Sequence, residues 1–376
     1  MELPLPFSLD PHSPQIAEAI ASLPESRGVY SVYLPGNPAP HLGWSINLRR
    51  RLTRLLLPSY TVGEFAVARH FQKATSVSCW PAGSRLEASL LLYQITRRHF
   101  PEDYLKRLRL RLPWFLALDT YDPFPRLETV NRPRRRHTVA YGPFFSRDLA
   151  QTHQQEIEGL FQVRRCTETL APSPEHPGCI YGEMNQCLRP CQCAVSQDEY
   201  ANEVARLDEF LSTNGKTATA ALTTARERAA FELDFEQAAQ LHKRLEKVSS
   251  AAASRDNVIA PLDKFNGIAL TRGIADQECR LWPMLGGYWQ NPLILQFNTM
   301  EPGARSLDQE LREKLAAALA APSDPPTGQH RVEHLAVFSR WYYSSWRDGH
   351  WFPFAGIADL NYRRLVREIS NLSRTC

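Results

Sequence analysis

The sequence has no apolar run long enough to cross a membrane and no signal peptide at its N-terminus. It also has little net charge, because 44 Lys and Arg against 40 Asp and Glu give +4. We therefore expect a soluble, cytoplasmic protein with no membrane partner, whose cysteines stay reduced unless they bind a metal. At 376 residues the chain is long enough for two or three domains.

The small net charge hides an uneven distribution. Residues 1–165 carry 22 Lys and Arg against 14 Asp and Glu, a net charge of +8, whereas residues 166–376 carry 22 against 26, a net charge of −4. A basic front half favours a nucleic-acid partner, because phosphates that bind Lys and Arg release counterions. For any one basic cluster the alternative is an ordinary solvated surface. The residues that we predict to contact DNA are Arg49, Arg50, Arg54, Arg134, Arg135 and Arg136.

Five of the eight cysteines lie in one stretch, residues 166–193, which is rich in Pro and Gly. The first four follow the spacing C-x12-C-x7-C-x3-C. Thiolates at such spacing suit a tetrahedral metal site, and the spacing alone leaves zinc and an iron–sulfur cluster open. A disulfide framework is the alternative, and the lack of a signal peptide disfavours it. The predicted ligands are Cys166, Cys179, Cys187 and Cys191.

Residues 1–112 predict a small domain that contains both helices and strands. Residues 27–34, RGVYSVYL, alternate as a strand does, and the turn PGNPAP leads to a second short strand, HLG. From Asn47 the segment NLRRRLTRLLL places Leu48, Leu52, Leu55 and Leu56 at helical spacing. Strand, turn, strand and an Arg-bearing helix form a specific order of elements.

This front part resembles the GIY-YIG nuclease domain of the excision-repair subunit UvrC. The matching motifs are Gly28-Val29-Tyr30, then HLG at residues 41–43, then WSINLRRRL at residues 44–52. The resemblance implies that Arg51 is the catalytic arginine, which stabilises charge at the phosphate, and that Tyr30 is an active-site tyrosine. His41 stands where the family has the tyrosine of the second strand.

Other family positions have lost their chemistry in this chain. Trp44 stands where the family has lysine, and Leu92 stands where the final glutamate of the EAxxLE helix binds the divalent cation. A leucine offers no oxygen to Mg²⁺ or Mn²⁺. Glu87 precedes Leu92 by five residues, which turns it about 140° around a helix, so it cannot substitute. We therefore expect the fold without the nuclease chemistry, and Mg²⁺ or Mn²⁺ only if the nuclease is active.

The middle of the chain resembles UvrC as well. The matching motifs are PRL at residues 125–127, GPF at 142–144 and CIYGEMNQCLRPC at 179–191. The resemblance implies a [4Fe–4S] cluster on the four predicted cysteine ligands, with zinc as the alternative. Between the last two motifs, residues 146–161 predict a helix that buries Leu149, Ile157, Leu160 and Phe161.

Residues 218–257 predict two helices with a break near Leu233 and Asp234. This segment resembles the UVR motif, a helical hairpin that in UvrC docks on a similar hairpin of UvrB. The alternative is that the hairpin packs within its own chain. The predicted partner-binding residues are Phe231, Leu233, Phe235, Ala238 and Leu241.

Residues 258–376 predict several strands and a helix at residues 307–320. The aromatic residues near Arg340 and Arg347 are assigned to a core rather than to stacking on unpaired bases. The RNase H-like and helix-hairpin-helix domains of UvrC are not found in this sequence. The predicted class is α+β, with a GIY-YIG α/β/α domain at 1–112, a connector and cysteine-cluster domain at 113–217, a UVR helical hairpin at 218–257 and a C-terminal α+β unit at 258–376.

The expected function is that of a UvrC-like protein of nucleotide excision repair and the SOS response. It is expected to bind double-stranded or damaged DNA and a UvrB-like protein, through a degenerate GIY-YIG site and the UVR hairpin respectively. The alternative is an active metal-dependent endonuclease that incises one strand of damaged DNA. A third hypothesis is a metal-cluster protein that senses rather than repairs.

Overall fold

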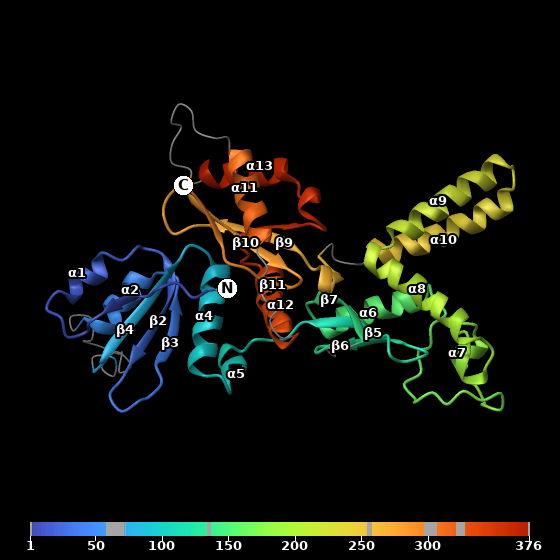
Figure 1. The fold of residues 1–376 in the computed structure, drawn as a ribbon, viewed down its shortest axis with the longest axis horizontal. Coiled ribbons are helices and arrows are strands. Elements are labelled where there is room, and N and C mark those ends of the chain that lie inside the picture. Colours follow the sequence, from blue (N-terminus) through green and yellow to red (C-terminus); the bar gives the residue numbers. More distant parts are fainter. Residues whose placement is uncertain are drawn as a thin grey trace. The chain divides into compact units, whose positions relative to one another are not determined.

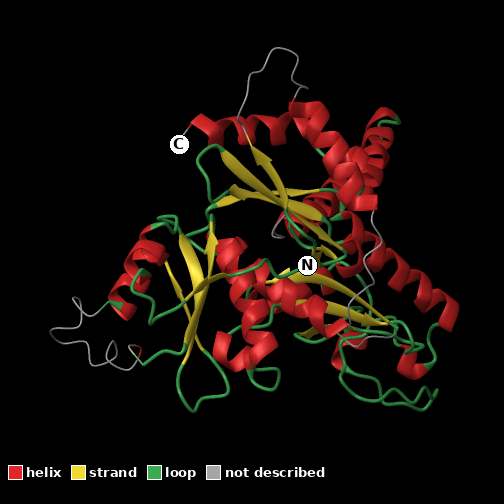
Figure 2. Cartoon of the chain, turned by 60° about the vertical axis from the view of Figure 1, so that its left-hand side comes forward, coloured by secondary structure: helices red, strands yellow, loops and turns green. Residues whose placement is uncertain are grey.

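The computed structural model describes residues 2–57, 71, 73–133, 137–253, 258–296, 307–320 and 328–374. The α+β class is confirmed, since helices accompany three separate antiparallel sheets (Figure 2). The chain divides into two compact units, the first formed by residues 1–111 and 266–376 and the second by residues 112–265. Within the described part, no helix combines the length and the hydropathy that a membrane span requires.

The N-terminal part of the first unit is a four-stranded sheet in the order β1-β4-β2-β3. One face packs against α1 and α2, and the other face packs against α4 (Figure 1). Its elements are β1 (Phe7–Leu9), α1 (Ile16–Ala21), β2 (Arg27–Tyr33), β3 (His41–Ser45), α2 (Leu48–Leu56), β4 (Ser76–Ala82), α4 (Arg85–His99) and α5 (Tyr104–Leu108).

Helix α2 forms where the leucine spacing predicts it. The side chain of Asn47 caps its start by accepting a hydrogen bond from the Arg50 N–H at 2.8 Å. All four predicted leucines are buried, so the opposite side of α2 presents its arginines to solvent. The order of strand, turn, strand and Arg-bearing helix is therefore confirmed.

The C-terminal part of the first unit is a five-stranded sheet in the order β11-β10-β9-β13, with β12 paired to β10. Helices α11 and α13 cover one face, and the aromatic side chains of α12 pack on the other through Trp351. The predicted aromatic core is confirmed for Phe338 and Trp341, which are fully buried, whereas Trp346 is only partly buried and lines a cavity. The elements are β9 (Gly267–Arg272), β10 (Glu278–Leu285), β11 (Tyr288–Trp289), β12 (Leu293–Gln296), α11 (Leu307–Ala320), α12 (Gly328–Tyr342), β13 (Gly349–Pro353) and α13 (Tyr362–Arg374).

The second unit joins a four-stranded sheet, β6-β5-β7-β8, to the cysteine stretch and a long helical hairpin. The predicted burial of Leu149 is wrong. Leu149 is 55% exposed, because it lies in the first turn of α6 and the buried side of that helix carries Ala150, His153 and Ile157. The elements are β5 (Trp114–Asp119), β6 (Leu127–Val130), β7 (Thr138–Phe144), α6 (Arg147–Glu158), α7 (Ile180–Glu183), α8 (Gln197–Thr213), α9 (Lys216–Phe231), α10 (Phe235–Ala253) and β8 (Ala260–Pro261).

Candidate nucleic-acid interface and cysteine site

Tyr30 and Arg51 lie together in the structure, as their family positions imply. The Arg51 Nε donates a hydrogen bond to the Tyr30 hydroxyl at 3.1 Å, and the guanidinium lies 5.9 Å from the centre of the tyrosine ring. The ring packs across Gly43 of β3, where an added Cβ would come within 2.4 Å of the hydroxyl oxygen. A glycine at position 43 is therefore required to hold Tyr30 beside Arg51.

His41 lies on the same face of the sheet as Tyr30, because it pairs with Val32 two positions further along β2. Its ring packs against Phe71, with 4.8 Å between the ring centroids. This contact with an apolar ring orients the imidazole toward Phe71. Three of the family positions, Tyr30, His41 and Arg51, thus come from one side of this small sheet.

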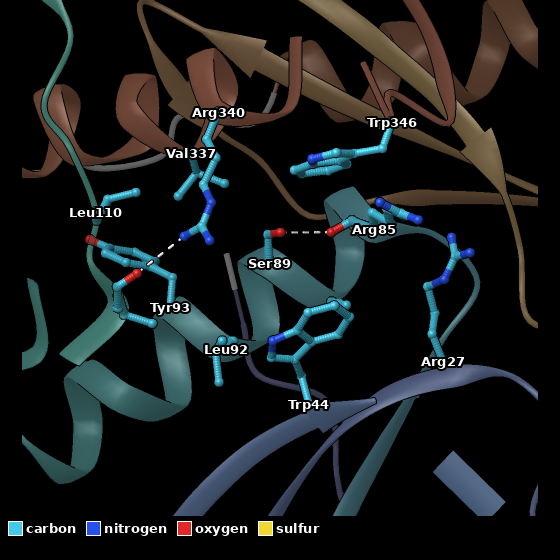
Figure 3. Close-up of a pocket in the computed structure, with 12 residues that line it drawn as sticks. Arg27, Trp44, Arg85, Ser89, Leu92, Tyr93, Leu110, Val337, Arg340 and Trp346 are labelled. Atoms are coloured by element: carbon cyan, nitrogen blue, oxygen red, sulfur yellow. Dashed lines mark hydrogen bonds between the residues drawn. The ribbon is translucent and has the colours of Figure 1, made fainter. Parts of the chain in front are cut away.

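Leu92 and Glu87 point to different sides of α4. Leu92 lies beside Trp44 in the wall of a cavity in the first unit (Figure 3). Glu87 is only 2% exposed and accepts a hydrogen bond from the Gly83 N–H at 2.9 Å. It also forms an ion pair with Arg280 of β10. Glu87 therefore ties α4 to the C-terminal sheet and is not turned toward Arg51.

Arg51 and Tyr30 have no carboxylate partner in the part of the chain that the structure describes. Over those same residues, no group of three or more His, Cys, Asp or Glu side chains is placed to hold a metal ion. The arrangement offers a guanidinium and a phenol to a phosphate. Both groups bind and orient an anion, whereas Mg²⁺-dependent cleavage also needs a cation ligand.

Two more acidic residues hold α4 to the C-terminal part of the first unit. Glu333 of α12 is 1% exposed and accepts hydrogen bonds from the hydroxyls of Tyr93 and Tyr104, both at 2.6 Å. Asp348 accepts from the Arg85 N–H at 2.6 Å and pairs with Arg27 at 2.5 Å. No local pattern in the sequence indicates these contacts, because the partners are more than 200 residues apart.

The predicted DNA-contacting residues of α2 differ in whether their side chains already have hydrogen-bond or ion-pair partners. Arg50 and Arg54 are exposed one turn apart, and neither has a side-chain partner among the described residues. Arg49 instead donates to the Leu23 carbonyl at 2.7 Å and pairs with Glu25 at 2.9 Å. Together with Arg51, the two free arginines form a basic strip along α2. Arg134, Arg135 and Arg136 lie outside the described residues.

The thiols of the four predicted metal ligands lie near enough in the second unit to interact electrostatically, although over the described residues they do not form a group placed to hold a metal ion. Burial raises the pKa of Cys187 and of Cys191, and the nearby thiols of Cys179 and Cys166 raise both further. Two N–H groups point at sulfur, the Arg189 backbone to Cys187 at 3.4 Å and the Arg164 guanidinium to Cys166 at 3.9 Å. All seven described cysteines are free thiols, so no disulfide joins them, and Cys193 is exposed.

Tyr200 fixes the start of the cysteine stretch. Its buried hydroxyl accepts a hydrogen bond from the Arg164 N–H and donates one to the Pro125 carbonyl, both at 2.8 Å. The Arg164 side chain also pairs with Asp122 at 2.6 Å. Helix α8 therefore positions Cys166 relative to the strands of the second unit.

The helical hairpin ends in an exposed apolar tip. Phe231 is 89% exposed, Leu233 is 72% exposed and Phe235 is 69% exposed. Leu233 has a φ of +60° between α9 and α10, and the Asp234 carboxylate caps α10 by accepting from the Gln237 N–H at 3.0 Å. The predicted break is confirmed. Ala238 and Leu241, further along α10, are partly buried.

Comparison with known proteins agrees with this arrangement. Residues 113–210 match the family described as UvrC/Cho excinuclease, middle domain. Among similar proteins are three named UvrABC system protein C: that of Nitratidesulfovibrio vulgaris is 28% identical over 71% of this chain and 41% of its own length. That of Sphingopyxis alaskensis is 29% identical over 66% and 38%. That of Alcanivorax borkumensis is 25% identical over 77% and 53%.

No solved structure matches the chain. The family match places a domain similar to the middle domain of UvrC/Cho excinucleases at residues 113–210. Over the rest of the matched residues the chain is similar to proteins named UvrABC system protein C at 25–29% identity. It spans about two fifths to a half of the length of the relatives above.

Replacing Glu87 with Gln is expected to remove a pH dependence of stability. Burial raises the pKa of Glu87 from 4.5 to about 7, against the opposing effect of Arg280. The folded chain holds this proton more tightly than the unfolded chain, so the contribution to stability is full below pH 4.5 and is lost as the pH rises toward about 7. A shift of this size corresponds to roughly 3 kcal/mol.

The measurement is the free energy of urea unfolding across this pH window. Glu87→Gln keeps an acceptor for the Gly83 N–H, and Arg280 keeps Glu278 at 2.8 Å. Glu102→Gln, at an exposed position, serves as the control and should leave the wild-type pH dependence in place. An unchanged pH dependence in Glu87→Gln would show that its carboxylate stays ionised in the folded chain.

Proposed function

We propose that this chain is a DNA-binding protein of nucleotide excision repair whose GIY-YIG-type domain no longer cleaves DNA. The observation that carries the proposal is that α4 presents no accessible carboxylate to a cation. Leu92 occupies the position of the cation ligand, and Glu87 is buried in an ion pair with Arg280. A hard divalent cation binds carboxylate oxygens and water, and neither residue offers it an accessible carboxylate. The names of the relatives support the assignment to the UvrABC system.

DNA binding is assigned to the basic strip of α2. Arg50, Arg51 and Arg54 project from one helix, and only Arg51 has a side-chain partner in the described part, the neutral Tyr30 hydroxyl. Exposed, unpaired guanidiniums bind phosphates without reading the base sequence. Duplex DNA, with or without damage, is therefore the substrate class that this surface fits.

Replacing both Arg50 and Arg54 with Ala is expected to weaken duplex binding at all sequences. Log affinity falls with log salt, and each lost phosphate contact makes this slope shallower by about 0.9. The slope of the double variant should therefore be shallower by about 2. Fluorescence anisotropy across a salt series measures this. Arg107→Ala is the matched control, because Arg107 is paired with Asp103 at 2.8 Å. An unchanged slope in the double variant would remove α2 from the interface.

Incision is tested separately on damaged duplex with Mg²⁺ or Mn²⁺. We expect no strand cleavage above background by the wild type or by Arg51→Ala. The preserved contact between Arg51 and Tyr30 is the one feature that favours an active endonuclease. Cleavage by the wild type that disappears in Arg51→Ala would establish that second function and end the proposal of a degenerate site.

The exposed hairpin tip is assigned to a UvrB-like partner. Phe231, Leu233 and Phe235 surround the turn between α9 and α10, where no described element of the second unit covers them. Large apolar side chains that remain this exposed favour a docking site over a purely intramolecular role. Ala238 and Leu241 continue this surface along α10.

Replacing Phe231, Leu233 and Phe235 with Ser is expected to abolish co-purification with UvrB, because the apolar contact area is lost while the helices keep their caps. Leu149→Ser is the control, since Leu149 is exposed on α6 of the same unit. Helix content from circular dichroism should stay at the wild-type value in both variants. Retained binding by the triple variant would refute the assignment of the tip.

The four neighbouring cysteines are assigned to a [4Fe–4S] cluster, with zinc as the alternative. Four soft thiols and two N–H groups directed at sulfur fit either occupant by donor chemistry. The residues that would hold it are Cys166, Cys179, Cys187 and Cys191. A bound group would link α7, the loop after α6 and the segment before α8, which supports a structural role.

Cys187→Ser is expected to lose iron, acid-labile sulfide and the visible absorbance band together, because one of four ligands is removed. The protein is purified without oxygen, and metal content is measured by mass spectrometry. Cys193→Ser, at the exposed neighbouring thiol, should retain all three signals. Zinc in place of iron would select the alternative, and a metal-free wild type would contradict both.

A further inference from the structure

The first unit contains a cavity that the function proposed above does not use. It lies between β3, α4 and the C-terminal part of the unit, and its volume is about 200 Å³ (Figure 3). This is smaller than the ~300–1,000 Å³ of pockets for drug-sized ligands, so it suits one ring system. The lining residues that matter here are Trp44, Arg85, Leu92, Tyr93, Arg340 and Trp346.

The cavity is positively charged. No Asp or Glu is among its lining residues. The Arg85 guanidinium lies 5.0 Å from the centre of the Trp346 ring, and Arg340 donates to the Leu108 carbonyl at 3.1 Å. Neither arginine forms an ion pair within the described ranges, whereas Arg27 is neutralised by Asp348. Two guanidiniums therefore remain for an anionic ligand.

The cavity also presents two indole rings. Trp44 projects from β3, and Trp346 projects from the loop after α12 on the opposite wall (Figure 3). Trp44 is 53% exposed on the edge strand β3, which leaves a large apolar surface open to a ligand. Neither indole N–H has a hydrogen-bond partner among the described residues, so each can donate to a ligand. Flat aromatic faces of this kind stack on nucleobases.

From these features we infer that the cavity binds a single nucleotide. Its base stacks on Trp44 or Trp346, and its phosphate is held by Arg85 and Arg340. The N-terminus of α4 does not bind the phosphate, because the Arg85 backbone N–H is already bonded to Asp348 at 2.6 Å. The nucleotide comes either from solution or from an unpaired end of a DNA strand, and both offer the same base and phosphate.

This inference is independent of duplex binding by α2. Trp346 and Arg340 belong to the C-terminal part of the unit, and none of the six lining residues named above lies on α2. The double variant Arg50→Ala and Arg54→Ala should therefore bind a mononucleotide as the wild type does. Loss of duplex binding and loss of nucleotide binding are thus separate outcomes.

Isothermal titration calorimetry on the full chain tests the site. The ligands are deoxythymidine 5′-monophosphate, a 5′-phosphorylated single-stranded oligothymidylate, deoxythymidine and inorganic phosphate. We expect the two nucleotide ligands to bind at least about tenfold more tightly than the nucleoside or phosphate alone. Only these two ligands carry both a base that stacks on an indole ring and a phosphate that binds the guanidiniums. Tighter binding of the mononucleotide identifies a free nucleotide, and tighter binding of the oligonucleotide identifies a strand end.

Variants show whether binding occurs in this cavity. Trp346→Ala and Arg85→Ala should each weaken nucleotide binding by about tenfold or more, the order expected for one lost stack or phosphate contact. Ser89→Phe fills the cavity and keeps all of its other lining residues. Its nucleotide affinity therefore shows whether binding occurs in the cavity even if Trp346→Ala does not fold. Arg98→Ala removes the same charge from an exposed position of α4 and should bind normally.

The inference is overturned by any of three results. One is the absence of nucleotide binding by the wild type. Another is full binding by a folded Ser89→Phe variant, as judged by an unchanged melting temperature. The third is an equal loss of binding in Arg98→Ala and Arg85→Ala, which would reduce the effect to general electrostatic attraction.

Discussion

Burial of α4 on two sides is the constraint on which the first unit depends. Leu91 and Ile95 pack against the N-terminal sheet, while Tyr93 reaches the buried carboxylate of Glu333 on α12. Figure 1 shows α4 between this sheet and the C-terminal elements. A helix buried on both sides carries no solvent-facing stripe along most of its length. Helix α4 is therefore an interior wall of the first unit.

This burial explains why the chemistry of α4 differs from that of the α2 side of the sheet. A cation site needs carboxylates that water and phosphate can reach, and Glu87 is instead held by Arg280 and the Gly83 N–H. On the other face, Arg51 remains exposed and bonded to Tyr30. The guanidinium on the α2 side is thus open to solvent, whereas the carboxylate of α4 is not.

The sequence predicted the elements that depend on local signals. The leucine spacing of α2, the break at Leu233 and the strands around Tyr30 all follow from neighbours within a few residues. Helix α12 was missed, because its run from Leu335 to Phe338 is buried throughout and gives no helical period. The contacts of Glu87, Glu333 and Asp348 were also missed, since nothing local indicates a partner far along the chain.

The candidate sites follow the same division between local and distant signals. The cysteines and the hairpin tip are short motifs, so the sequence located them without knowledge of the fold. The cavity at Trp44 was beyond reach of the sequence, because Trp346 and Arg340 meet it only after the C-terminal part packs against α4. From the sequence alone, Leu92 indicated only that a side chain without oxygen stands where a cation ligand is expected. In the folded unit Leu92 is an apolar part of the wall of this cavity, beside Trp44.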